Sequence, residues 1–262
     1  PMMDKARIEK YGDELYDALI NRQPVAPLTD READITIEDA YQIQQRMIQR
    51  RLDAGETIIG KKIGVTSKVV MDMLKVNQPD FGMMTSGMVF NEGESIDTST
   101  MIAPRAEAEV AFVLKSDLMG PGVTAADVLR ATDFVVPCFE IVDSRIQDWK
   151  IKIQDTVADN ASCGVLVLGG RRKSPADIDL ALAGMVLEKN GEIISTSTGA
   201  AVQGSPVNAV AWLANTLGNL GIGLKAGEVI LSGSQSPLVP VKAGDSLVCT
   251  VGGLGGTSVR FI

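Results

Sequence analysis

The stretch 104-PRAEAEVAFVL-114 has the pattern of a buried β-strand, yet it carries Glu107 and Glu109 two residues apart. Alternate side chains of a strand share a face, so both carboxylates point the same way, with Cα atoms roughly 6.8 Å apart. From Val110 onward the run is apolar on both faces, which indicates burial. Two neighbouring carboxylates beside a buried run repel each other and tend to take up protons unless a cation is present.

A second apolar stretch, 137-PCFEIVDSR-145, places Glu140 among Phe139, Ile141 and Val142. If the two strands are neighbours, three carboxylates converge, and a divalent cation would relieve their repulsion. Oxygen-only donors favour Mg²⁺ or Mn²⁺ over zinc or copper. The alternative is a solvated face on which Arg105 or Arg145 pairs with these acids, and the spacing alone leaves both open.

The composition narrows the chemistry further. The chain has 262 residues, 45% of them hydrophobic, a formal net charge of -8 and no histidine. The missing histidine excludes Ser-His-Asp and Cys-His catalysis and histidine-ligated zinc. The acidic balance disfavours nucleic acid and anionic membrane surfaces as partners. Any chemistry must therefore use carboxylates, lysine, hydroxyls, backbone amides or an oxygen-bound metal.

Several features favour a cytoplasmic protein. No apolar run approaches the roughly 20 residues that span a bilayer. The N-terminal stretch PMMDKARIEK has no hydrophobic core of the signal-peptide kind. The three cysteines are odd in number and have no metal-ligand spacing, which suits a reducing compartment and small buried side chains.

The periodicity predicts an α+β fold, with a small helical N-terminal part over residues 1–78 and a strand-rich body over 79–262. Helices are expected at 4–22, 37–55 and 66–76, separated by a strand and turn at 57–66. The body contains short strands rich in valine, isoleucine and leucine, with a hairpin at Asn190-Gly191. Two further helices are expected, at 124–132 and from a Ser205 cap onward.

Four other segments contain candidate site residues. In 60-GKKIGVTS-67 the two lysines alternate along a strand, so one of them can face a pocket. Asp80 in 78-QPDFG-82 is either an acid-base group or a turn residue. The loops 159-DNASCG-164 and 231-LSGSQSP-237 offer small polar side chains that suit an anion and equally suit a plain turn.

Taken in order, several segments resemble one known family, and they span nearly the whole chain. They are GKKIGVTSK, QPDFG, PRAEAEVAFVL, DLMGPGVT, PCFEIVDSRIQDWKIKIQDTVADNASCG, EKNGEI, GSPVNAVAWLANTLG and LKAGEVILSGS. The sequence is similar to the fumarylacetoacetate hydrolase-like superfamily and, within it, to the 2-oxopent-4-enoate hydratases. The resemblance implies a mixed β-sheet roll or sandwich carrying the small helical part.

The resemblance also implies roles for individual residues. Three glutamates would be the ligands of Mg²⁺ or Mn²⁺, Lys62 and Asp80 would be catalytic, and two serines would approach the substrate; the ligands are Glu107, Glu109 and Glu140, and the serines are Ser162 and Ser234. The sister decarboxylases carry an apolar residue at the position of Asp80, which favours a hydratase. A nearby cation and a partly dry pocket are expected to lower the pKa of Lys62 towards neutrality.

The implied reaction is addition of water to 2-hydroxypenta-2,4-dienoate, giving 4-hydroxy-2-oxopentanoate in bacterial breakdown of aromatic compounds by meta-cleavage. The family also implies a homo-oligomer and association with the sister decarboxylase. Two alternatives stay open: a decarboxylase acting on 4-oxalocrotonate (2-oxohex-3-enedioate), and a non-catalytic scaffold that docks such a decarboxylase.

Overall fold

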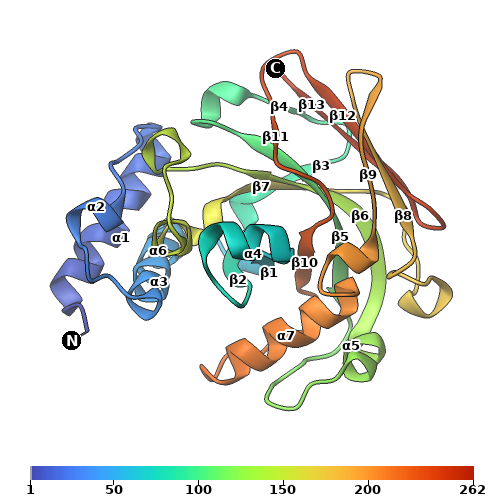
Figure 1. The fold of residues 1–262 in the computed structure, drawn as a ribbon, viewed down its shortest axis with the longest axis horizontal. Coiled ribbons are helices and arrows are strands. Elements are labelled where there is room, and N and C mark those ends of the chain that lie inside the picture. The colour runs from blue at the N-terminus through green and yellow to red at the C-terminus, as the bar shows by residue number, and fades with distance from the viewer. Residues whose placement is uncertain (1) are drawn as a thin grey trace.

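A computed structural model describes residues 2–262 and contains two β-sheets (Figure 1). The larger, eight-stranded sheet has the order β2 (Asp80–Thr85), β1 (Ile58–Gly64), β10 (Val229–Ser234), β5 (Arg105–Leu114), β6 (Thr132–Val142), β7 (Cys163–Leu168) and β3 (Val89–Asn91), with β11 (Val239–Pro240) beside β5. The five-stranded sheet has the order β4 (Ser95–Ile96), β13 (Gly255–Phe261), β12 (Ser246–Val251), β8 (Gly184–Lys189) and β9 (Glu192–Thr198). Both contain parallel and antiparallel pairs, as the mixed α+β expectation requires.

The helices form two groups around the sheets. At the N-terminal end lie α1 (Lys5–Asn21), α2 (Leu28–Arg31), α3 (Ile37–Asp53) and α6 (Ile153–Ala158), which share a hydrophobic cluster of their own (Figure 1). The others are α4 (Lys68–Leu74), α5 (Ala125–Ala131) and α7 (Pro206–Gly218). Thr36 and Asp39 form the capping box that starts α3, and Ser205 caps α7 with Pro206 in the first turn.

The main core lies between the two sheets and under α7. Strand β6 contacts both β12 and β13 of the smaller sheet, while α7 packs on β10 and α5. Val110 and Phe112 of β5 and Leu213 of α7 are buried in the same cluster. The continuous apolar run after Glu109 is therefore explained by burial on both faces of β5.

Strand β1 joins the N-terminal part to the body. It precedes residue 79 in the chain, yet it pairs with both β2 and β10 inside the eight-stranded sheet. The backbone of β10 approaches so closely at Gly60 that a Cβ there would collide with the Val229 carbonyl. The two parts thus share one sheet, and the boundary between residues 78 and 79 stays a prediction.

The three cysteines are free and buried, as expected of small hydrophobic side chains. Within residues 2–262, none of the helices combines the length and apolar character that crossing a bilayer requires.

Candidate metal centre and active site

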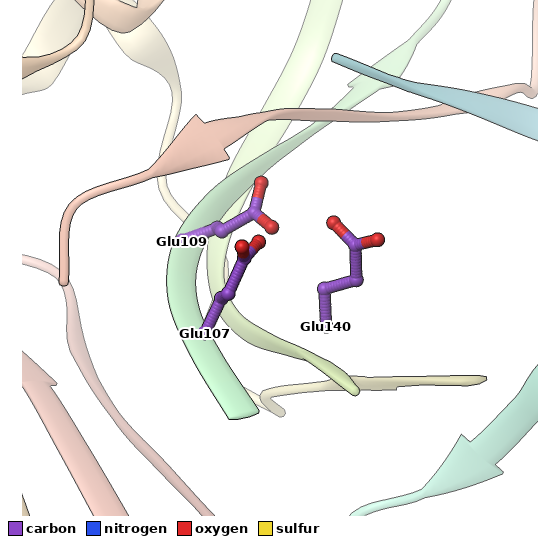
Figure 2. A group of neighbouring side chains, drawn as sticks. All are labelled: Glu107, Glu109 and Glu140. Atoms are coloured by element: carbon purple, nitrogen blue, oxygen red, sulfur yellow. The ribbon is translucent and has the colours of Figure 1, made fainter. Parts of the chain in front are cut away.

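The three candidate ligand glutamates converge because β5 and β6 are adjacent and antiparallel. Glu107 lies directly opposite Glu140 in the register, and Glu109 follows two residues along the same face of β5. One carboxylate oxygen of each residue lies within 4.8 Å of the others. Figure 2 shows the three carboxylate groups pointing into one common space.

These carboxylates are sheltered and short of partners. Glu109 and Glu140 are fully buried, and Glu107 is half-buried. Oε1 of Glu109 accepts a hydrogen bond from the Gly233 amide at 2.8 Å, whereas Oε2 of Glu109 and Oε1 of Glu140 have no hydrogen-bond partner. Buried polar atoms are normally satisfied, so these oxygens fit a ligand that is itself electron-poor.

The net charge of the three glutamates also favours a bound cation. Burial and the charge of Glu140 raise the pKa of Glu107 to about 7 and raise the pKa of Glu109 well above its ordinary value. The cation beside the cluster is Lys62, whose Nζ lies 3.0 Å from Oε2 of Glu140. One ammonium facing three glutamates leaves two negative charges, which a divalent cation with oxygen ligands would balance.

Neither arginine that could have neutralised the glutamates does so. Arg105 stacks its guanidinium over the Trp149 ring, 4.5 Å from the centroid. Arg145 forms a buried ion pair with Asp159, with 2.5 Å between Nε and Oδ1. The open alternative of arginine-paired acids is therefore not what the structure contains.

Adjacent lysines of β1 face opposite sides of the sheet, as strand alternation requires. Lys61 pairs with Glu228, with 2.5 Å between Nζ and Oε2, whereas Lys62 points to the glutamates and donates to the Ala161 carbonyl at 2.6 Å. Burial lowers the pKa of Lys62, but the charges of Glu140 and Glu107 outweigh it and raise this pKa above its ordinary value. In the protein without a bound cation the pKa of Lys62 is therefore raised and not lowered, because the nearby carboxylates stabilise the ammonium.

Asp80 is the first residue of β2 and is buried rather than placed in an exposed turn. Its Oδ1 atom has no hydrogen-bond partner. Burial raises the pKa of Asp80 to about 6, although the charge of Lys62 opposes the change. A carboxyl group with a pKa this close to neutrality suits acid-base chemistry.

A cavity of about 610 Å³ is lined by five of the seven candidate residues, while Glu109 and Glu140 lie behind its wall. Its wall includes Lys62, Asp80, Glu107 and both candidate serines, Ser162 and Ser234. Each serine hydroxyl already has a protein partner: Oγ of Ser162 lies 2.8 Å from Oγ1 of Thr156, and Oγ of Ser234 donates to the Ser236 carbonyl at 2.6 Å. The serines therefore border the cavity, and their contact with substrate stays a prediction.

Two features of the wall were not predicted as site elements. Gln235 is buried, and its Oε1 atom has no hydrogen-bond partner. It lies in the 231–237 loop that the sequence marks as suited to an anion. The other is the Ala161 carbonyl that accepts from Lys62. A backbone carbonyl gives no signal in a sequence pattern, so only the fold reveals it.

Comparison with known proteins agrees with the fold and identifies the family. A family profile described as fumarylacetoacetate (FAA) hydrolase C-terminal matches residues 61–261. A 2-hydroxyhexa-2,4-dienoate hydratase of Comamonas testosteroni is 58% identical over 99% of both chains. A 2-hydroxypent-2,4-dienoate hydratase of Pseudomonas putida is 65% identical over 84% of this chain and all of its own.

The solved structure of 4-oxalocrotonate decarboxylase from Pseudomonas putida G7, complexed with magnesium and adipate, is also similar. It superposes with a TM-score of 0.97 at 36% identity and covers 100% of this chain and 99% of its own. With mixed sheets and a carboxylate cluster inside them, the chain belongs to the fumarylacetoacetate hydrolase family. Its high identity to named hydratases further identifies it as an enzyme of the hydro-lyase class, as the resemblance implied.

Proposed function

We propose that this protein is a divalent-metal-dependent hydratase that adds water to 2-hydroxypenta-2,4-dienoate and gives 4-hydroxy-2-oxopentanoate. The observation that carries the proposal is the convergence of three carboxylates, one ammonium and one perturbed aspartate at one site, with Lys62, Asp80 and Glu107 lining a single cavity. The high identity to named dienoate hydratases supports the same reaction. The proposed ligands of Mg²⁺ or Mn²⁺ are Glu107, Glu109 and Glu140.

A divalent cation held by these glutamates would supply Lewis-acid stabilisation of negative charge on the C2 oxygen of the substrate. The protein residues would handle the protons. Lys62 is an ammonium in this setting and is placed to donate a proton or to hold the substrate carboxylate. Asp80, with a pKa of about 6, is ionised near neutral pH and is placed to accept one.

The reaction is proposed in two stages. The 2-hydroxydienoate loses its C2 hydroxyl proton and gains one at C5, which gives an unsaturated 2-oxo acid that is electrophilic at C4. Asp80 then takes a proton from water as the water oxygen bonds to C4, and a proton delivered to C3 completes the net addition of one water. Lys62 is the proposed donor, and Ser162 and Ser234 are proposed to border the bound substrate.

Decarboxylation of 4-oxalocrotonate is the second candidate, because the decarboxylase superposes so closely. The cavity wall argues against it. Lys62 is the one cationic side chain among the described residues that line the cavity. The wall also includes the apolar side chains Val69, Val70 and Met73 of α4. A second substrate carboxylate would enter this region without a counter-ion, which is costly.

A spectrophotometric assay tests the proposal. Loss of dienoate absorbance should require Mg²⁺ or Mn²⁺ after chelation, and unchanged turnover without a metal would end the metal assignment. The matched assay offers 2-oxohex-3-enedioate and measures CO₂ release. Faster release of CO₂ than hydration would favour the decarboxylase, and loss of neither substrate would favour the non-catalytic scaffold.

Self-association, a complex with a sister decarboxylase and a cytoplasmic location stay predictions. Size-exclusion chromatography with light scattering, on the protein alone and mixed with such a decarboxylase, tests the first two.

A further inference from the structure

A strained turn borders the cavity between α6 and β7. Asn160, Ala161 and Ser162 are three consecutive non-glycine residues with positive φ angles of 54°, 52° and 57°. L-residues rarely adopt this left-handed conformation singly and very rarely in a row. Backbone strain of this kind persists where the surroundings impose it, and it concentrates at functional sites.

A buried ion pair holds the two ends of this turn. Asp159, just before the turn, accepts from both the backbone amide and Nε of Arg145, at 2.9 and 2.5 Å. The same guanidinium donates through Nη2 to the Asp159 carbonyl at 2.8 Å and through Nη1 to the Cys163 carbonyl at 2.9 Å. Arg145 thus bridges the residue before the turn to the residue after it, and both charged groups are fully buried.

A second contact fixes the middle of the turn to β2. The side-chain amide of Asn160 accepts from the Met83 amide and donates to the Met83 carbonyl, both at 2.8 Å. Gly82 allows this approach, because a Cβ there would lie 2.5 Å from the Asn160 carbonyl oxygen. The turn is therefore held by two separate parts of the chain, the segment after β6 and strand β2.

The turn presents the Ala161 carbonyl to the site. This oxygen accepts from Nζ of Lys62 at 2.6 Å, and the same Nζ lies 3.0 Å from Glu140. The hydrogen bond fixes the ammonium at the edge of the glutamate cluster, where it faces the cavity. Without this hydrogen bond, only the ion pair with Glu140 would orient the flexible side chain of Lys62.

We infer that Arg145 and Asp159 are positioning residues for Lys62: they hold the 160–162 turn in its left-handed conformation, so that the Ala161 carbonyl orients the ammonium towards the substrate. Neither residue touches the cavity, and their effect passes through the backbone of the turn. The inference rests on the proposed function only for its kinetic consequence. The structural consequence, a loosened turn, can be measured without any substrate.

Asp159→Asn tests this inference, and Glu228→Gln is the matched control. In D159N the amide NH₂ must face either the Arg145 amide or its Nε, so one of the two bonds is lost whichever way the amide is turned. E228Q neutralises the acid of a different buried ion pair, which Lys61 forms on the opposite face of β1. We expect kcat to fall about tenfold or more in D159N with KM changed less, because small misplacements of a reacting group are costly.

Recovery of kcat in a double variant separates a positioning role of Asp159 from a general loss of structure. Ala161→Gly removes the left-handed penalty at the centre of the turn, so D159N/A161G should recover much of the kcat lost in D159N. Equal kcat loss in D159N and E228Q, no loss in D159N, or no recovery on adding A161G would each overturn the inference. Hydrogen exchange of the segment 155–166 gives an independent reading, with faster exchange expected in D159N than in wild type or E228Q.

A second pair of variants tests the same inference in case the D159N protein fails to fold. Asn160→Ala and Asn160→Gly both lose the contact with Met83, but only glycine adopts the positive φ angle without strain. We expect higher kcat and slower exchange in N160G than in N160A, and the reverse order would overturn the inference. A wild-type protein that does not consume the dienoate would refute the proposed function, while the exchange comparison would still decide whether the turn is held as inferred.

Discussion

Replacing Asp80 by asparagine should make the metal-free protein more stable, and more so as the pH rises. The carboxyl group is buried, and burial raises its pKa from 3.8 to about 6 in the folded protein. The unfolded chain therefore releases this proton first. The protonated Asp80 makes its full contribution to the free energy of unfolding below about pH 4. This contribution is lost as the pH rises through about 6.

The size of the effect follows from linkage. The ionised Asp80 costs the folded state about 1.6 kcal/mol at about pH 5 and about 3 kcal/mol at about pH 8, relative to a group that stays neutral. An amide does not titrate, so the stability of D80N relative to wild type should increase by about 1.4 kcal/mol between these two pH values. The hydrogen bonds that the amide gains or loses cancel from this difference.

Urea unfolding followed by tryptophan fluorescence, in the presence of a chelator, measures this difference. Asp133→Asn is the control, because Asp133 is exposed on β6. Turnover of the dienoate should fall by a factor of about 10² or more in D80N, the usual loss on removing an acid-base group. A gain in stability that stays constant or shrinks towards higher pH would refute the assignment of Asp80 as a buried carboxyl held close to ionisation.

Three further predictions concern the metal site and its surroundings. Glu109→Gln removes one negative ligand and keeps the size of the side chain, so calorimetry should show Mn²⁺ binding weakened by about tenfold or more; unchanged affinity would exclude Glu109 as a ligand. Adding Mn²⁺ at about 100 times its Kd should raise the free energy of unfolding of wild type by about 2.7 kcal/mol, and a metal that leaves thermal unfolding unmoved would contradict the site. Gly82→Ala should destabilise the protein by about 1–3 kcal/mol in urea unfolding, because the new methyl group meets the Asn160 carbonyl; a neutral effect would mean that the turn moves easily.

Strand periodicity predicted much of the site. Glu107 and Glu109 share a face because they are two residues apart, and the alternation of Lys61 and Lys62 required that only one of them face the cavity. The choice of Lys62 came from the resemblance, since the two lysines have equivalent local patterns. The meeting of Glu140 with Glu107 depends on the register of β5 and β6, which no local pattern contains.

Other parts of the site could not be predicted because they depend on long-range contacts. The segment 159-DNASCG-164 reads as a polar loop, and its only glycine lies after the three left-handed residues. Arg145 was considered as a partner of the glutamates, yet it binds Asp159, fourteen residues further along the chain. Its true partner becomes clear only when the segment after β6 and the end of α6 are brought together.

The neighbouring lysines of β1 also raise a question about how this strand finds its alignment during folding. A slip of one residue would place either Lys61 in the position of Lys62, beside Glu140, or Lys62 in the position of Lys61, beside Glu228. Each slip keeps one lysine–acid pair and loses the other, so the ion pairs discriminate only in part between the native alignment and its nearest competitors. Gly60 discriminates well, because the slipped strand would push a side chain against the Val229 carbonyl. A residue without any side chain thus disfavours a misfolded form that would bring Lys61 into the cavity in place of Lys62.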